Sequence, residues 1–187
     1  MRKDFGPQSW VFPMPVLIIG TYDENGKPDA MNAAWGAIYD TNQVTVSLAG
    51  HTTTDNIRKN KAFTIAFATV DTLVASDYVG IVPQKKVPNK IEKAGLTAVK
   101  SKNVNAPIFE QYPVTIECEL VSLDGEEGEG GTLVGQIVNV TADEKVLTDG
   151  KVDVTKLNAI SYDPFTHKYL VVNQVVGNAF KDGLKIK

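Results

Sequence analysis

Residues 30–60 read AMNAAWGAIYDTNQVTVSLAGHTTTDNIRKN, and the organisation of the chain can be worked out from this stretch. Residues 31–37 predict a strand of mostly small side chains that carries one large aromatic, Trp35. Residues 44–48 are rich in β-branched side chains and predict the next strand. Residues 50–56 combine Gly, His, three Thr, Asp and Asn, which is typical of the start of a helix. We expect the N-cap of this helix at Thr53, Thr54 or Asp55.

The same three segments have the features that a flat, polar, phosphorylated ligand needs. Small side chains let a ring system approach the backbone closely. Hydroxyl groups and free N–H groups at a helix start can hold a phosphate. The stretch therefore suggests a flavin nucleotide site, and the remaining sequence can be compared with that hypothesis.

The segments on both sides of residues 30–60 also predict short strands, turns and helices. Residues 15–22 predict a buried strand, and Asn25-Gly26 predicts a tight turn after it. The chain is then expected to return as one strand over residues 29–39. Alternation predicts a fourth strand over residues 62–68. Short helices are expected over residues 53–60, 72–78 and 90–94, the last stopped by Gly95.

The second half contains the clearest strand of the chain, residues 113–120. Its apolar residues should share one face: Val114, Ile116, Cys118 and Leu120. Its polar residues should share the other: Thr115, Glu117 and Glu119. An acidic hairpin loop over residues 124–131 leads to a returning strand over residues 132–141, whereas residues 101–112 predict irregular structure. Cys118 is interpreted as a small core residue and His167 as a surface residue.

Six or seven strands at short spacing with three short helices indicate a mainly β fold, a barrel with added peripheral helices. The sequence has no regular alternation of strands and helices and no GxGxxG motif, which excludes a Rossmann fold. Neither an internal repeat nor a linker divides the 187 residues, so one domain over residues 1–187 is expected.

Composition narrows the function classes. The chain is 43% hydrophobic and 22% charged, as in ordinary globular proteins. A net charge of -3 gives no reason to expect a nucleic-acid partner. No apolar run approaches the ~20 residues of a membrane span. The single cysteine cannot form an internal disulfide, so a cytoplasmic location is the default expectation. No spacing of His, Cys, Asp and Glu indicates a metal site.

Several short motifs follow one another in a familiar order. They are Pro15-Val16-Leu17-Ile18-Ile19-Gly20-Thr21, Asn25-Gly26, Asn32-Ala33-Ala34-Trp35-Gly36, His51-Thr52 through Asn56-Ile57, Asp77-Tyr78-Val79-Gly80, Lys90, Ala94-Gly95-Leu96-Thr97, Ala106-Pro107 and Gly177-Asn178-Ala179-Phe180. Over residues 13–180 the chain resembles the flavin reductase-like, FMN-binding split-barrel family, and within it the flavoredoxin group. The resemblance implies a Greek-key-like split β-barrel.

The resemblance also implies a homodimer that binds FMN non-covalently near the subunit interface, with NAD(P)H as co-substrate or a redox protein as partner. Carried over to this sequence, the ring of FMN would lie along Asn32, Ala33, Ala34, Trp35 and Gly36. The ribityl chain and phosphate would lie at Ser47, Leu48, His51, Thr52, Thr53 and Asn56. Lys90 would contact the phosphate or the substrate.

Two departures from the family pattern concern this site. The chain has Pro83-Gln84 and Asn89-Lys90-Ile91 where relatives often have Ser-Gly and Asp-Lys-Phe. This difference concerns the side of the site where the nicotinamide would bind. It has His51 where Arg is common, and a neutral His binds phosphate less strongly than Arg does.

Each of these interpretations has a purely structural alternative. Trp35 could fill the barrel core instead of lying beside a flavin or an interface. His51 could be an ordinary surface histidine, and the threonines could act only as helix caps. Three functions remain open: an FMN-dependent oxidoreductase that uses NAD(P)H, an FMN-containing electron carrier with little NAD(P)H activity, and a non-enzymatic barrel that binds flavin or haem.

Overall fold

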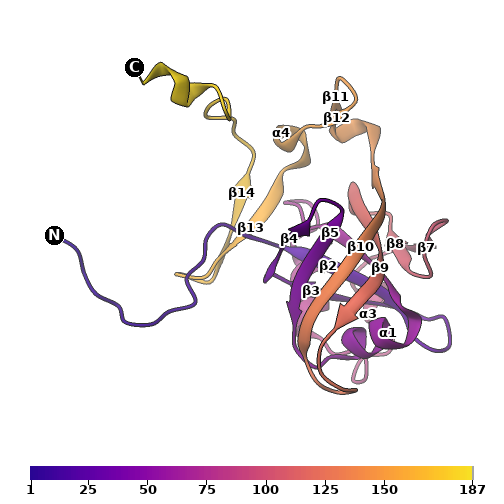
Figure 1. Ribbon diagram of the computed structural model, residues 1–187. Helices are drawn as coiled ribbons and strands as arrows, with labels where there is room; N and C mark the ends of the chain where they lie inside the picture. The colour runs from indigo at the N-terminus through magenta and orange to yellow at the C-terminus, as the bar shows by residue number, and fades with distance from the viewer. Residues whose placement is uncertain (187) are drawn as a thin grey trace.

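The computed structural model describes residues 1–186, and its main element is one antiparallel sheet of seven strands in the order β3-β2-β6-β9-β10-β5-β4. Figure 1 shows this sheet curled on itself. In chain order its strands are β2 (Leu17–Tyr22), β3 (Pro28–Ala33), β4 (Gly36–Asp40), β5 (Gln43–Leu48), β6 (Ala62–Phe67), β9 (Val114–Leu123) and β10 (Gly131–Ala142). The predicted mainly β, split-barrel fold is confirmed.

The two edge strands explain why the sheet must curl. β3 and β4 lie at opposite edges, yet only Ala34 and Trp35 join them. In a flat sheet six gaps between strands would separate these edges by about 29 Å. Three Cα–Cα steps span at most about 11 Å. The sheet therefore has to bring its two edges together, and the split in the barrel falls at Ala34–Trp35.

This crossing corrects the prediction of one strand over residues 29–39. The chain forms β3 and β4 with an interruption between them, because it leaves one edge of the sheet and joins the other. The hairpin before it is confirmed, with β2 paired to β3 and Gly26 at φ +75° in the turn.

Two hydrophobic cores lie on the two faces of β2. Leu17 and Ile19 point into the barrel, where they pack with residues such as Phe63 and Cys118. Val16 and Ile18 point outward into a second core with residues of β6 and the helices. Cys118 is fully buried, and desolvation, followed by the charge of Glu117, raises the pKa of its thiol to about 12. Its prediction as a core residue is confirmed.

β9 is more buried than its alternation predicts. Thr115 and Glu117, on the predicted polar face, are only 2% and 1% exposed. The segment predicted as irregular, residues 101–112, contains one short strand, β8 (Pro107–Phe109), which pairs with β7 (Ala98–Lys100) just before it. The loop between these two strands contributes to the burial of Glu117. Desolvation raises the pKa of Glu117, but hydrogen bonds from Ser101, Asn139 and Asn103 outweigh it and hold that pKa below its ordinary value.

The helices are short and peripheral, as expected. α1 (Thr52–Asn60) follows β5, and α2 (Leu73–Ile81) and α3 (Lys90–Lys93) follow β6. Gly95, at φ +70°, ends the α3 segment as predicted. Further along the chain are the 3-10 helix η1 (Glu144–Val146), β11 (Leu147–Thr148), β12 (Lys151–Val152) and α4 (Val154–Leu157). Over residues 1–186, no helix has the length and apolar character needed to span a membrane.

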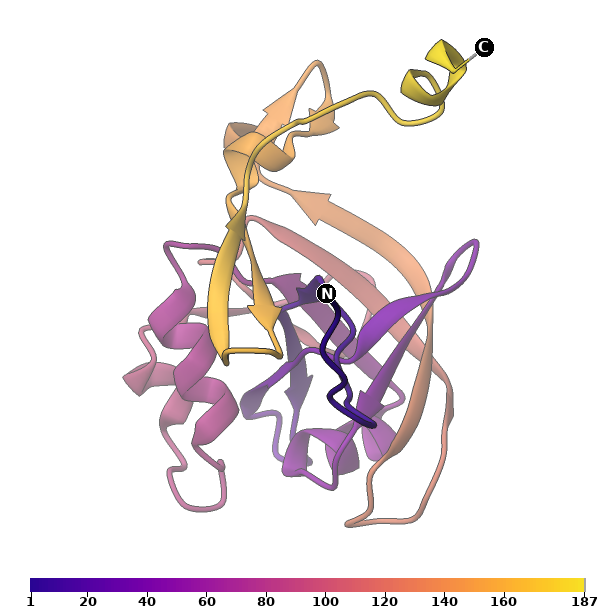
Figure 2. The same cartoon turned by 90° about the vertical axis from the view of Figure 1, so that its left-hand side faces the viewer.

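A second sheet carries the two ends of the chain. It joins β1 (Met14–Pro15), β13 (Ala159–Asp163) and β14 (Lys168–Val172). Beyond it, residues 1–13 and 173–186 run away from the barrel (Figures 1 and 2), the latter ending in the 3-10 helix η2 (Asp182–Lys185). Val176 and Phe180 are 91% and 100% exposed in this C-terminal arm, which leaves apolar surface without cover from the chain itself.

Candidate functional site

Three hollows lie in a row along the split between β3 and β4. The α1 hollow, between the starts of α1 and α3 and the end of α2, has a volume of about 190 Å³. The central hollow, between α2 and the β13–β14 hairpin, has about 270 Å³, and the Trp35 hollow has about 440 Å³. Asn32, Gly80 and Ile81 line both the first and the second, and Ala34 lines both the second and the third. Each hollow thus shares lining residues with the next, and the three together are called the trough below.

Most of the predicted site residues line this trough. The α1 hollow is lined by Asn32, His51, Thr52, Thr53 and Lys90, and the Trp35 hollow by Ala34, Trp35, Gly36 and Ser47. The side chains of Ala33 and Leu48 instead belong to the barrel core. Asn56 is buried and donates a hydrogen bond to Thr21 Oγ1 at 3.1 Å. These last three residues line none of the three hollows.

At the start of α1, two of the three threonine hydroxyls are already engaged within the chain. The helix begins at Thr52, and His51 occupies the N-cap position with extended φ and ψ of -126° and 162°, so the predicted caps at Thr53, Thr54 and Asp55 are wrong. The hydroxyl of Thr53 donates to Asp29 Oδ2 and that of Thr54 to the Ala49 carbonyl, both at 2.8 Å. The first N–H groups of any helix lack a partner within the helix. An anion at this end would therefore be held mainly by backbone amide groups.

A buried ion pair underlies this hollow. Lys90 and Asp29 are 3% and 1% exposed, and Lys90 Nζ lies 2.8 Å from Asp29 Oδ1. The same ammonium group donates to the carbonyl oxygens of Val82 and Val79 at 3.2 and 3.4 Å. Three acceptors match the three protons of an ammonium group. The charge and hydrogen bonds of Lys90 are thus satisfied within the chain.

Gln84 joins the same network from the loop after α2. With its amide nitrogen turned toward Asp29, it donates to the two carboxylate oxygens at 2.5 and 3.1 Å. Together with Thr53 and Lys90, it connects Asp29 on β3 to α1 and α3. The network fixes the walls of the α1 hollow relative to one another.

The central hollow brings together side chains from two distant parts of the chain. The Tyr169 hydroxyl on β14 donates to Asp77 Oδ1 on α2 at 2.8 Å. Desolvation, together with the hydrogen bond and the charge of Asp77, raises the pKa of Tyr169 to about 12. Tyr162, on the neighbouring strand β13, lines the same hollow, and its hydroxyl lies 2.5 Å from His167 Nδ1. His167 is exposed, as predicted.

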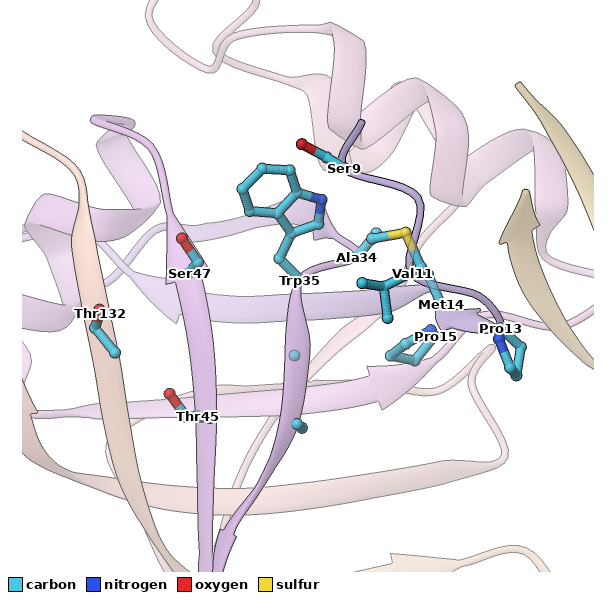
Figure 3. A pocket seen from close by; sticks show the side chains of 12 residues that line it. Ser9, Val11, Pro13, Met14, Pro15, Ala34, Trp35, Thr45, Ser47 and Thr132 are labelled. Carbon is cyan, nitrogen blue, oxygen red and sulfur yellow. The ribbon is translucent and has the colours of Figure 1, made fainter. Parts of the chain in front are cut away.

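Figure 3 shows the Trp35 hollow, with the indole standing out from the chain beside Ser47 and Ser9. Trp35 is 59% exposed, so the alternative that it fills the barrel core is wrong. Its carbonyl oxygen accepts a hydrogen bond from Ser47 N at 2.8 Å. A Cβ on Gly36 would lie 2.5 Å from Leu17 Cδ1. Glycine at the start of β4 therefore allows this strand to pack closely against the Leu17 side chain. Aliphatic residues such as Val11, Met14 and Pro15 line the same hollow.

The acidic loop over residues 124–131 lies beside α1 and is held there. Arg58 on α1 donates to the carbonyl oxygens of Asp124 and Glu129 at 2.8 and 3.0 Å. Gly128 N donates to Asp55 Oδ1 at 2.8 Å. The loop is therefore held against the helix by these three hydrogen bonds. Within residues 1–186, no group of three or more His, Cys, Asp or Glu side chains could hold a metal ion.

The sequence did not reveal the partners within the trough. Asp29 was expected only as the first residue of a strand, and no sequence pattern indicated a role for Tyr169. Asp77 and Gln84 stand in motifs that the sequence singled out, but nothing indicated what they contact. A buried Asp predicts a cationic partner in general. Its partner here, Lys90, lies on a separate element, so spacing alone cannot identify the pair.

Comparisons with known proteins agree with this architecture. Residues 9–157 match the family described as flavin reductase like domain. The structure resembles flavoredoxin of Desulfovibrio vulgaris (Miyazaki F) with a TM-score of 0.91 and 30% identity, over 98% of this chain and 100% of that chain. It also resembles flavoredoxin from Methanosarcina acetivorans, with a TM-score of 0.88 and 22% identity over 100% of both chains. A protein of Archaeoglobus fulgidus is 30% identical over 148 residues, which cover 78% of this chain and 81% of that protein.

Proposed function

Because the chain belongs to the family of flavin reductase-like domains, we propose that it is an FMN-dependent oxidoreductase of the flavoredoxin type. In this proposal it moves hydride or electrons between NAD(P)H, non-covalently bound FMN and an acceptor. The bound flavin supplies the redox chemistry, while the protein binds and orients it.

One observation carries the proposal: one end of the trough combines polar side chains with the backbone donors of a helix start, whereas the other end is apolar with an exposed aromatic. FMN has the same polarity along its length. We assign the phosphate to the N–H groups at the start of α1, beside His51 and Thr52. The ring would lie along the backbone of residues 32–36, where small side chains allow close approach. Ser47 would face the edge of the ring.

Lys90 has a different role in this proposal from the one its motif implies. Its ammonium group is buried and paired with Asp29, so it would hold the hollow in shape rather than bind phosphate directly. Gln84 would do the same from the loop after α2.

An electron carrier with little NAD(P)H activity is the second candidate. The observation that favours it is the inward orientation of Lys90 and Gln84, which leaves these two polar groups of the altered loop engaged with Asp29. They are then not offered to a nicotinamide dinucleotide. A redox protein would serve as electron donor or acceptor in this case.

We further propose a homodimer in which the second copy covers the Trp35 end of the trough. Trp35, Val11 and Phe12 are 59%, 73% and 45% exposed near the split. The C-terminal arm presents further apolar side chains. Exposed apolar surface of this kind is typical of a contact between protein chains. A cytoplasmic location agrees with such a protein and stays a proposal.

Two measurements test the function. Purified protein should carry, or take up, about one FMN per subunit, identified by absorbance and by mass of the released ligand. Rapid mixing of the FMN-loaded protein with NADH and with NADPH then separates the two candidates. Bleaching of the flavin within seconds indicates the reductase, and persistent yellow colour indicates the carrier. Protein that takes up no FMN contradicts both.

A further inference from the structure

The central hollow contains a carboxylate that no cation neutralises. Asp77 is half-buried on α2 and accepts one hydrogen bond, from the hydroxyl of Tyr169 at 2.8 Å. None of the ion pairs formed within residues 1–186 includes Asp77. Asp29 in the neighbouring hollow differs, since Lys90 compensates its charge at 2.8 Å. Among the described residues, the trough thus has one carboxylate that is paired with a cation and one that is not.

The other residues around the central hollow carry no full charge. They are Asn32, Ala34, Gly80, Ile81, Tyr162 and Tyr169. A charge in such partly desolvated surroundings acts more strongly than one in water. The Asp77 carboxylate has such an effect on Tyr169, because its hydrogen bond and charge add to desolvation in raising the pKa of Tyr169 to about 12.

We propose that Asp77 lowers the reduction potential of a flavin bound in the trough. This inference rests on the proposed function, since Asn32 and Ala34, which line the hollow with Asp77, are assigned there to the ring. Uptake of two electrons and one proton gives the ring a negative charge, whereas two electrons and two protons leave it neutral. A nearby carboxylate opposes the first outcome, so the bound flavin becomes a stronger reductant.

The test is a redox titration of FMN-loaded protein against a dye of known potential, at one fixed pH. Asp77→Asn keeps the shape of the side chain and an oxygen that can accept from Tyr169, but removes the charge. At the potential where the parent is half reduced, we expect the ratio of reduced to oxidised FMN in this variant to be about tenfold higher. For a two-electron couple that ratio corresponds to about 30 mV.

Two control variants separate charge from structure. Asp71→Asn removes an exposed negative charge just before the same helix and should leave the potential unchanged. Tyr169→Phe removes the hydrogen bond to Asp77 but keeps the charge, so its potential should not rise. Circular dichroism and FMN absorbance check that each variant is folded and loaded.

The outcomes divide as follows. A potential that rises in Asp77→Asn alone is the expected result. An unchanged potential in that variant, or an equal rise in Tyr169→Phe or Asp71→Asn, overturns this inference while leaving the proposed function standing. A parent protein that takes up no FMN overturns both.

Discussion

The α1 hollow and the Trp35 hollow belong to one trough, yet their lining side chains differ in whether they find partners within the chain. Around the α1 hollow, Asp29, Lys90, Thr53 and Gln84 pair with one another and are nearly inaccessible. Around the Trp35 hollow, the indole is 59% exposed and aliphatic side chains face outward. One end is complete within a single chain, and the other leaves apolar surface uncovered.

Because only one end is complete within the chain, the two ends should respond to different perturbations. Changes in the buried network should act on the stability of the fold, because the network connects β3, α1 and α3. Changes at the apolar end should act on association between chains. Changes to the backbone donors of α1 should act on phosphate binding alone. The following experiments test that separation.

The largest effect is expected from Asp29→Leu, which leaves the Lys90 charge buried without a partner. Breaking a buried pair in this way typically costs about 3–5 kcal/mol. Urea unfolding should show this loss in the free energy of unfolding. The matched variant Asp29→Leu with Lys90→Met removes both charges and should recover most of it. A single variant as stable as the parent would mean that the pair is not a structural element of this hollow.

The C-terminal arm should show the next largest effect. Val176→Asp together with Phe180→Asp places charges on side chains that are 91% and 100% exposed in the isolated chain. Truncating a hot-spot residue at the centre of an interface costs about 2 kcal/mol or more in association, and we expect these two apolar side chains to be of that kind. Light scattering should change from twice the chain mass to the chain mass of 20.3 kDa. Lys181→Asp, in the same arm, should leave the dimer intact. A parent protein of 20.3 kDa would contradict the homodimer.

The sequence predicted the fold better than it predicted the site. Alternation and turn residues identified the long strands and the hairpin at Gly26, because these signals are local. The break at Ala34 and Trp35 was missed, since it arises from where β3 and β4 sit in the closed sheet. No local pattern contains that information.

The site residues divide along the same line. The sequence predicted His51, Thr52 and Trp35 because they stand in one stretch with a recognisable chemistry, and all three line the trough. The pairing of Lys90 with Asp29, and of Tyr169 with Asp77, joins elements far apart in the chain. Glu117 was assigned to a polar face for the same reason, since its cover comes from the loop between β7 and β8. Partners brought together only by tertiary structure leave no spacing to read.

A smaller effect is expected from Thr52→Pro, which removes one backbone N–H at the first position of α1. Proline is well tolerated there. The preceding residue, His51, already has the extended φ of -126° and ψ of 162° that proline requires. We expect FMN affinity to fall about tenfold, or ~1.4 kcal/mol. Riboflavin, which lacks the phosphate, should bind unchanged. Thr52→Ala keeps the N–H and lacks only the hydroxyl, so the difference between the two variants measures the backbone donor; equal losses for FMN and riboflavin would place the phosphate elsewhere.

The smallest effect, and the only gain, is expected from His51→Arg. An arginine at this exposed position brings a permanent charge and a planar fork of donors to the α1 hollow. Exposure screens the interaction, so FMN affinity should rise only about threefold, or ~0.6 kcal/mol. The gain should fade as salt is raised, since screening weakens exposed charge pairs. A positive charge beside the start of α1 also opposes the helix dipole, which should lower the unfolding free energy of the FMN-free protein by a few tenths of a kcal/mol. His51→Gln lacks the charge and should show neither change. If His51→Arg strengthens riboflavin binding as much as FMN binding, position 51 contacts the ring rather than the phosphate, and the two ends of the trough have been assigned in reverse.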